Sequence, residues 1–144
     1  MKKPIFWPAG YQWMHEYALA LPGAELEYKP TWEALLYRLH GKVFLLLLQN
    51  RQNGKLANLK CDPYVSLALQ QEYPAILPGW HMNKLHWISL VLNGKTPRDV
   101  CEQLVLNSYG LVREGLPRNV SGQLKASPAF LSFIESRNSH ITEM

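Results

Sequence analysis

The chain has 144 residues, of which 47% are hydrophobic and 18% are charged, so it is long and apolar enough to bury the core of one domain. The formal net charge is +4, and the longest strongly apolar run, residues 43–48, is far shorter than the roughly 20 residues of a membrane-spanning helix. Prolines and polar residues interrupt residues 1–16, so we expect no signal peptide and no membrane partner. We therefore expect a cytoplasmic protein whose two cysteines, Cys61 and Cys101, are reduced and buried.

The first half of the sequence predicts one helix and then four short strands. Residues 11–21 form the predicted helix, which ends at Pro22-Gly23, a pair that stops helices and turns the chain. Alternation of apolar and polar residues predicts strands at residues 25–30, 34–39 and 56–61, the first at an edge because it contains proline. Residues 43–48 are apolar at every position, which places that strand in the centre of the sheet.

The second half predicts two helices separated by a corner and a strand. Asp62-Pro63 should start the first, because aspartate caps free backbone N–H groups and proline needs no partner at the first helical position. We expect this helix to end near residue 72, a corner rich in proline and glycine at residues 73–83, and a strand at residues 85–92. Thr96-Pro97 should start the last long helix by the same logic. The order is helix, three or four strands, helix, two strands, helix, which predicts an α+β fold with an antiparallel sheet and helices on one face.

Basic residues concentrate in the middle of the chain. Between Glu33 and Asp62 there is no acidic residue, but there are five cations, Arg38, Lys42, Arg51, Lys55 and Lys60. A two-stranded ribbon carrying these cations could neutralise phosphates and enter a DNA groove. In the alternative interpretation they form a solvated hairpin that discourages edge-to-edge aggregation.

Residues 78–87 form the most unusual segment, with two histidines, two tryptophans, an asparagine and a lysine. His81, Asn83 and His86 are a candidate ligand site, and Lys84 is a further candidate contact to a ligand or to DNA. Alternatively, Asn83 and His86 hydrogen-bond the backbone of the corner while Trp87 fills the core. We expect no metal, because the histidines lie five residues apart and no carboxylate lies between them. No catalytic or cofactor-binding motif is found, so no enzyme activity and no cofactor are expected.

Several of these segments together resemble the MmcQ/YjbR-like family. The resemblance is carried by Leu21-Pro22-Gly23, Asn58-Leu59-Lys60-Cys61-Asp62-Pro63, Tyr73-Pro74, Pro78-Gly79, His81-Met82-Asn83-Lys84, His86-Trp87 and Asn107-Ser108-Tyr109. It implies a two-layer α-β(3)-α-β(2)-α fold with a five-stranded antiparallel sheet, similar in outline to secretion chaperones. Members are often described as DNA-binding, and the resemblance implies no catalytic residue here. Two parts depart from the family's pattern: Lys29-Pro30-Thr31-Trp32, where a Pro-Phe-Gly-like turn is usual, and the segment beyond Gly115.

These observations give three functional hypotheses for a domain at residues 1–116 with a C-terminal extension at residues 117–144, where a short helix is expected at 127–137. The first is a small, basic, non-enzymatic protein that binds DNA. The second is a protein-interaction or chaperone-like module, or a homodimer. The third is an enzyme that uses His81 or His86.

Overall fold

A computed structural model of the chain describes residues 11–117. In chain order the elements are α1 (Gln12–Leu19), β1 (Ala24–Lys29), the 3₁₀ turn η1 (Pro30–Trp32), β2 (Ala34–Leu39), β3 (Lys42–Asn50), β4 (Gly54–Lys60), α2 (Pro63–Glu72), β5 (Ile76–Pro78), β6 (Trp87–Val91) and α3 (Arg98–Glu114). The predicted C-terminal extension, with its short helix, lies outside the described residues. No helix among residues 11–117 is long and apolar enough to cross a bilayer.

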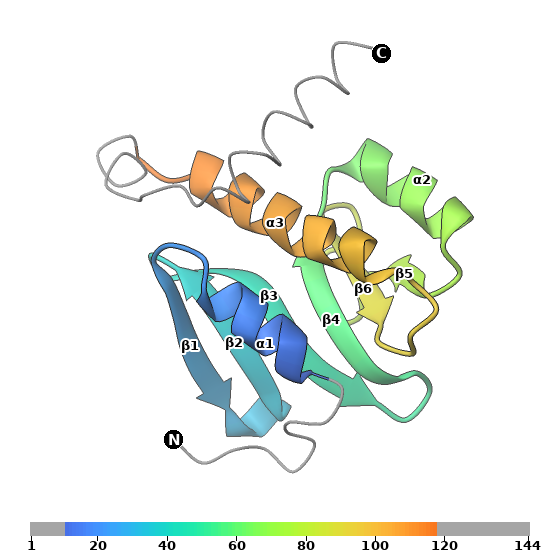
Figure 1. Cartoon of the computed structure of the whole chain (residues 1–144), viewed down its shortest axis with the longest axis horizontal. Coiled ribbons are helices and arrows are strands. Elements are labelled where there is room, and N and C mark those ends of the chain that lie inside the picture. Colours follow the sequence, from blue (N-terminus) through green and yellow to red (C-terminus); the bar gives the residue numbers. More distant parts are fainter. Residues whose placement is uncertain (1–10, 118–144) are drawn as a thin grey trace.

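The strands form one antiparallel sheet in the order β1-β2-β3-β4-β6-β5 (Figure 1). This confirms the predicted α+β class and the central position of the apolar strand, here β3. The sheet has six strands rather than five, because part of the predicted corner pairs with β6 as β5, with Ile76 opposite Leu90. Pro78 is tolerated in β5 because this strand lies at an edge, where one side needs no backbone donor.

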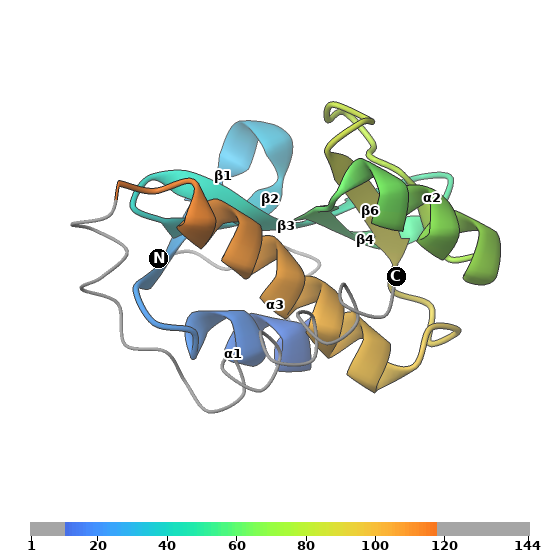
Figure 2. The ribbon, with the colours of Figure 1, turned by 90° about the horizontal axis from the view of Figure 1, so that it is seen from above.

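Helices α1 and α3 pack against one face of the sheet, and α2 lies beside β5 at its edge (Figure 2). The main core lies between this face and α1 and α3. Its largest fully buried side chains include Tyr37, Phe44 and Tyr109. The two cysteines are free thiols within this core, as predicted.

Local signals account for one helix start but not for the other. The Asp62 side chain accepts a hydrogen bond from the Tyr64 backbone N–H at 2.9 Å, so the predicted cap of α2 is confirmed. The predicted cap by Thr96 is wrong, because Pro97 occupies the N-cap position of α3 and no side chain caps this helix. The buried Thr96 hydroxyl has no hydrogen-bond partner among the described residues.

Two side chains of α3 fasten the helix to the rest of the fold. The Ser108 hydroxyl donates to the Phe44 carbonyl at 2.6 Å and accepts from the Lys60 backbone N–H at 2.8 Å. The Tyr109 hydroxyl donates to the Pro22 carbonyl at 2.6 Å. Buried backbone groups that the sheet leaves unpaired are costly, so these bonds fix where α3 crosses the strands.

Candidate functional site

Within residues 11–117, no helix covers the face of the sheet opposite α1 and α3, which we call the open face (Figure 2). It is nevertheless apolar. A second cluster of buried side chains lies there: Ala34, Leu36, Leu46, Leu48 and Leu56. The two flanking segments, η1 and the corner between β5 and β6 (residues 79–86), rise above this cluster and leave a groove between them. The groove above this buried cluster is the candidate binding site.

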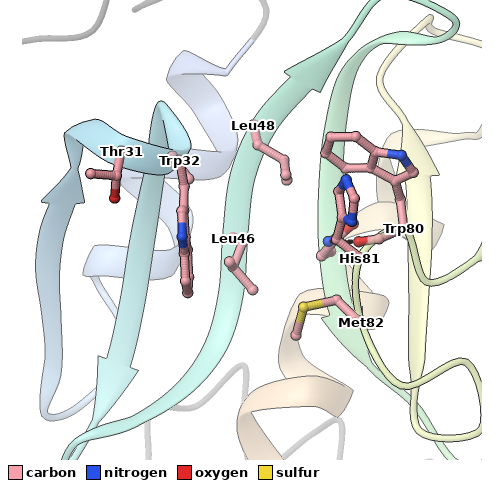
Figure 3. A pocket seen from close by; sticks show the side chains of 9 residues that line it. Thr31, Trp32, Leu46, Leu48, Trp80, His81 and Met82 are labelled. Carbon is pink, nitrogen blue, oxygen red and sulfur yellow. Dashed lines mark hydrogen bonds between the residues drawn. The ribbon is translucent and has the colours of Figure 1, made fainter.

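The groove has a volume of about 520 Å³, which lies within the roughly 300–1,000 Å³ range of ligand pockets. Its floor is formed by strand residues and its walls by residues of η1 and the corner: Thr31, Trp32, Ala34, Leu46, Leu48, Asn58, Trp80, His81 and Met82. Figure 3 shows Trp32 on one side and Trp80, His81 and Met82 on the other, with Leu46 and Leu48 of β3 between them. The site is therefore a trough that follows β3, lined by two indole rings.

The corner wall begins with a close approach between Gly79 and Trp87. A Cβ atom on Gly79 would lie 2.8 Å from the Trp87 Cβ and 2.9 Å from its carbonyl oxygen, so only glycine fits. The Asn83 side chain then accepts hydrogen bonds from the backbone N–H groups of Leu85, at 2.9 Å, and His86, at 3.3 Å. The Lys84 ammonium donates to the Gly79 carbonyl at 3.1 Å. The contacts of Gly79, Asn83 and Lys84, which belong to the segments that carry the family resemblance, therefore hold the backbone of the corner in a compact turn.

A buried polar network joins the corner to the floor of the groove. Asn58 is 1% exposed, and its side chain donates to the Trp80 carbonyl at 3.0 Å. The Ser89 hydroxyl donates to the Asn58 side-chain oxygen at 2.6 Å and accepts from the Trp80 backbone N–H at 2.8 Å. Both backbone polar groups of Trp80 are therefore held by side chains of β4 and β6, which sets the position of this wall.

The opposite wall is built from the segment that departs from the family's pattern. Pro30 starts the short turn, and Glu33 ends it in the left-handed conformation, with φ 48°. Trp32 is 55% exposed, and the Lys29 ammonium lies 3.9 Å from the centroid of its ring. This cation–π contact holds the indole at the edge of the groove while much of its surface stays open to solvent.

The predicted ligand residues do not form one site. His81 lines the groove in the left-handed conformation, with φ 57°, and its ring centroid lies 4.1 Å from that of Trp80. Asn83 holds the turn, as the structural alternative predicted, while His86 is exposed and its carbonyl accepts from the Cys61 N–H at 2.8 Å. Sequence reasoning missed the groove residues Trp80 and Met82, although both lie in the segment it selected. It also missed Trp32, whose only signal was the departure from the family's turn.

A catalytic arrangement is not evident around the two histidines. Within the described part of the chain, no hydrogen bond or ion pair joins His81 or His86 to a carboxylate, and no three His, Cys, Asp or Glu side chains gather to hold a metal ion. The thiols are unsuited to nucleophilic chemistry near neutral pH, because burial raises the pKa of Cys61 and of Cys101 to about 11.

The predicted cations do not converge on one surface. Arg51 lies in the β3–β4 turn and Lys42 at the start of β3, so roughly 26 Å of strand separates the two ends of the ribbon. Lys55 lies over the Tyr11 ring on the helix-covered face, whereas Lys60 alternates with core residues and lies on the open face. Arg38 is paired with Glu27 at 2.9 Å.

The YjbR family model matches residues 19–111. The chain belongs to the YjbR family. It is 40% identical over 101 residues to the protein YbdF of Escherichia coli O157:H7, a match that covers 70% of this chain and 82% of that one. It is 30% identical over 94 residues to YjbR of Escherichia coli K12, covering 65% and 79% of the two chains.

Solved structures support the same assignment for this YjbR-family chain. The crystal structure of Deinococcus radiodurans protein DR2400 superposes with a TM-score of 0.68 at 27% identity, covering 76% of this chain and 83% of that one. A Pseudomonas syringae protein gives a TM-score of 0.60, also at 27% identity, covering 70% and 97%. The names of these proteins state no ligand and no reaction.

Proposed function

We propose that this YjbR-family chain is a non-enzymatic protein-interaction module, chaperone-like in the sense that its groove receives apolar side chains of an extended peptide segment. The observation that carries the proposal is an apolar trough between Trp32 and Trp80 on a sheet face that no described helix covers. Grooves of this shape bind peptides by accepting large side chains into preformed pockets. A cytoplasmic location is part of the proposal, because two unpaired thiols suit a reducing compartment.

The chemistry of the open face favours a peptide over a nucleic acid. The floor is made of aliphatic residues such as Leu46 and Leu48, whereas sheet proteins that bind single strands stack bases on aromatic side chains of the sheet itself. Charge on the strands is also nearly balanced. Residues that alternate with the core on this face are Glu25, Glu27, Lys29, Arg38 and Lys60, three cations against two carboxylates.

Trp32 supplies a measurable share of the expected binding energy. A tryptophan that becomes fully covered buries roughly 150–250 Å², and about half of this surface is still exposed here. At about 25 cal/mol per Å², covering the remaining 100 Å² contributes about 2.5 kcal/mol. Trp32→Ala should therefore weaken binding by one to two orders of magnitude. Folding stability should fall by less than about 1 kcal/mol, because η1 contains no buried residue.

A phage library of random heptapeptides, panned on the immobilised full chain, tests the proposal while the natural partner is still unidentified. We expect enrichment of peptides with aromatic and large aliphatic residues, lost with Trp32→Ala. The matched control is Tyr64→Ala, because this aromatic side chain is 86% exposed on α2, away from the groove. Absence of enrichment, or equal enrichment on Trp32→Ala, would show that the groove is not the binding site.

DNA binding through the β3–β4 turn is the second candidate, favoured by the exposure of Arg51 at the tip, with Lys55 four positions further along the chain. Each phosphate neutralised contributes about −0.9 to the slope of log K against log salt. The double variant Arg51→Ala, Lys55→Ala should therefore flatten the slope for duplex DNA by about 2. If the wild-type chain shows no binding at 50 mM salt, this candidate is wrong.

A further inference from the structure

The charged residues around the groove suggest which peptides it accepts. Three lysines lie next to residues that line the trough, and we call them the rim lysines: Lys29 over Trp32, Lys84 in residues 79–86, and Lys60 on β4, two positions after Asn58. Glu33 at the end of η1 carries a negative charge on the same side of the molecule, and Arg38 forms an ion pair with Glu27. With Glu25 of β1 also on the open face, the positive charges around the groove exceed the negative ones by one.

Lys60 is the rim lysine best placed to meet a bound peptide. It follows Asn58, a residue of the groove floor, by two positions on the same face of β4, which places its Cα roughly 7 Å further along the strand. Its ammonium makes no ion pair with any carboxylate of residues 11–117, in contrast to Arg38. Lys29 and Lys84 are instead engaged with the Trp32 ring and the Gly79 carbonyl.

The carboxylate nearest to Lys60 in sequence, Asp62, accepts the capping hydrogen bond from the Tyr64 N–H and makes no ion pair with Lys60, and the carboxylates on the strands are too far away to neutralise it. Glu25 and Glu27 lie on β1, and β2 and β3 separate that strand from β4. Three strand spacings of about 4.8 Å amount to roughly 14 Å, which exceeds the Debye length of about 8 Å at physiological salt. An unpaired, half-buried lysine at the end of an apolar floor is complementary to a carboxylate on the ligand.

Resting on the proposed function, we infer that the partner segment is an extended acidic peptide, in which an aromatic or aliphatic anchor fills the groove and an Asp or Glu pairs with Lys60. Geometry also sets the spacing of this motif. From Leu56, opposite the groove residue Leu48, to Lys60 the strand advances four residues, or roughly 13 Å. An extended peptide covers this distance in about four residues, so the acidic residue should lie two to four positions from the anchor.

The test begins with the peptides that the library enriches. One of them is synthesised with a fluorescent label, together with a version whose acidic residues are replaced by the corresponding amides. Dissociation constants are measured by fluorescence anisotropy for the wild type, Lys60→Ala and the control Lys95→Ala, an exposed lysine in the β6–α3 connection. Thermal melting of each variant confirms that it is folded.

We expect the amide replacement to weaken binding to the wild type about tenfold, and Lys60→Ala to cause a similar loss for the acidic peptide. The two changes should not add, because they remove the same pair. Lys95→Ala should bind both peptides like the wild type, and 500 mM NaCl should shrink the difference between them.

The outcomes separate this inference from the proposed function. If no peptide is enriched, the peptide-binding function fails and the inference falls with it. If apolar peptides are enriched without acidic residues, only the inference is overturned. It is also overturned if replacing the acidic residues of the peptide by amides weakens binding to Lys60→Ala as much as it weakens binding to the wild type. Displacement of the bound peptide by a 20-nucleotide oligo-dT would assign the rim lysines to phosphates instead, and would also overturn it.

Discussion

Removal of the Asn58 carboxamide tests whether a buried polar network holds the corner against the sheet. Asn58→Ala deletes the bond to the Trp80 carbonyl at 3.0 Å and the bond from the Ser89 hydroxyl at 2.6 Å. Two lost bonds cost about 0.5–1.5 kcal/mol each, and a buried polar group left without a partner costs a further 1–3 kcal/mol. We expect the free energy of unfolding to fall by about 3 kcal/mol, or roughly 10 °C in Tm for a chain of this size.

Urea denaturation followed by tryptophan fluorescence and by circular dichroism measures this loss, and an unchanged m-value would show that the unfolded state is unaffected. Asn93→Ala is the matched control, because the same side chain there accepts one hydrogen bond, from the Lys95 N–H at 3.0 Å, on an exposed turn. This variant should lose less than about 1 kcal/mol. If Asn58→Ala is no less stable than Asn93→Ala, the network does not hold the corner. Combining Asn58→Ala with Ser89→Ala should cost less than the sum of the single losses, because both act on one network.

Three further predictions concern packing, pH and the attachment of α3. Gly79→Ala should lower the free energy of unfolding by about 1–3 kcal/mol and weaken peptide binding, because the Cβ of the alanine would collide with Trp87. An unchanged melting temperature would contradict the close approach. Burial raises the pKa of both thiols to about 11, so the folded state keeps protons that the unfolded state releases from about pH 9 upwards. The protonated thiols should therefore contribute their full stabilisation below about pH 9. Between pH 9 and 11 the free energy of unfolding should fall, by at most about 2.8 kcal/mol per pH unit for Cys61 and Cys101 together. A free energy of unfolding that does not change over this range in urea titrations would refute the prediction. Ser108→Ala should cost about 2–3 kcal/mol in the same urea assay, since it leaves a β3 carbonyl and a β4 N–H without their partner, whereas a loss under 0.5 kcal/mol would show that other groups replace the hydroxyl.

The fold was largely predictable from the sequence because its signals are local. The apolar run of β3, the alternation in β2 and β4, and the Asp62 cap each report the environment of their own segment. The strand β5 was missed because it has three residues and contains a proline, too short for any periodicity to show. Thr96 was misread because a capping residue is defined by backbone geometry at the helix start, and here Pro97 occupies that position.

The groove was less predictable because its parts meet only in three dimensions. The segment around His81 was recognised as unusual, but its opposite wall, Trp32, lies almost 50 residues earlier in the chain. The dispersal of the cations could have been anticipated. Lys55 and Lys60 are five positions apart, an odd number, so in one uninterrupted strand their side chains must point to opposite faces.

The two walls of the groove differ in how freely they can vary. The corner wall depends on Asn58 and Gly79, whose substitution would leave buried groups unpaired or create a collision, so its shape is tied to the stability of the fold. The η1 wall contains no buried residue, and its replacement would cost little folding energy. A different turn at residues 29–32 would therefore remove Trp32 and Lys29 from the groove and leave the sheet intact. The choice of ligand can thus change at η1 while the corner and the sheet below it stay the same.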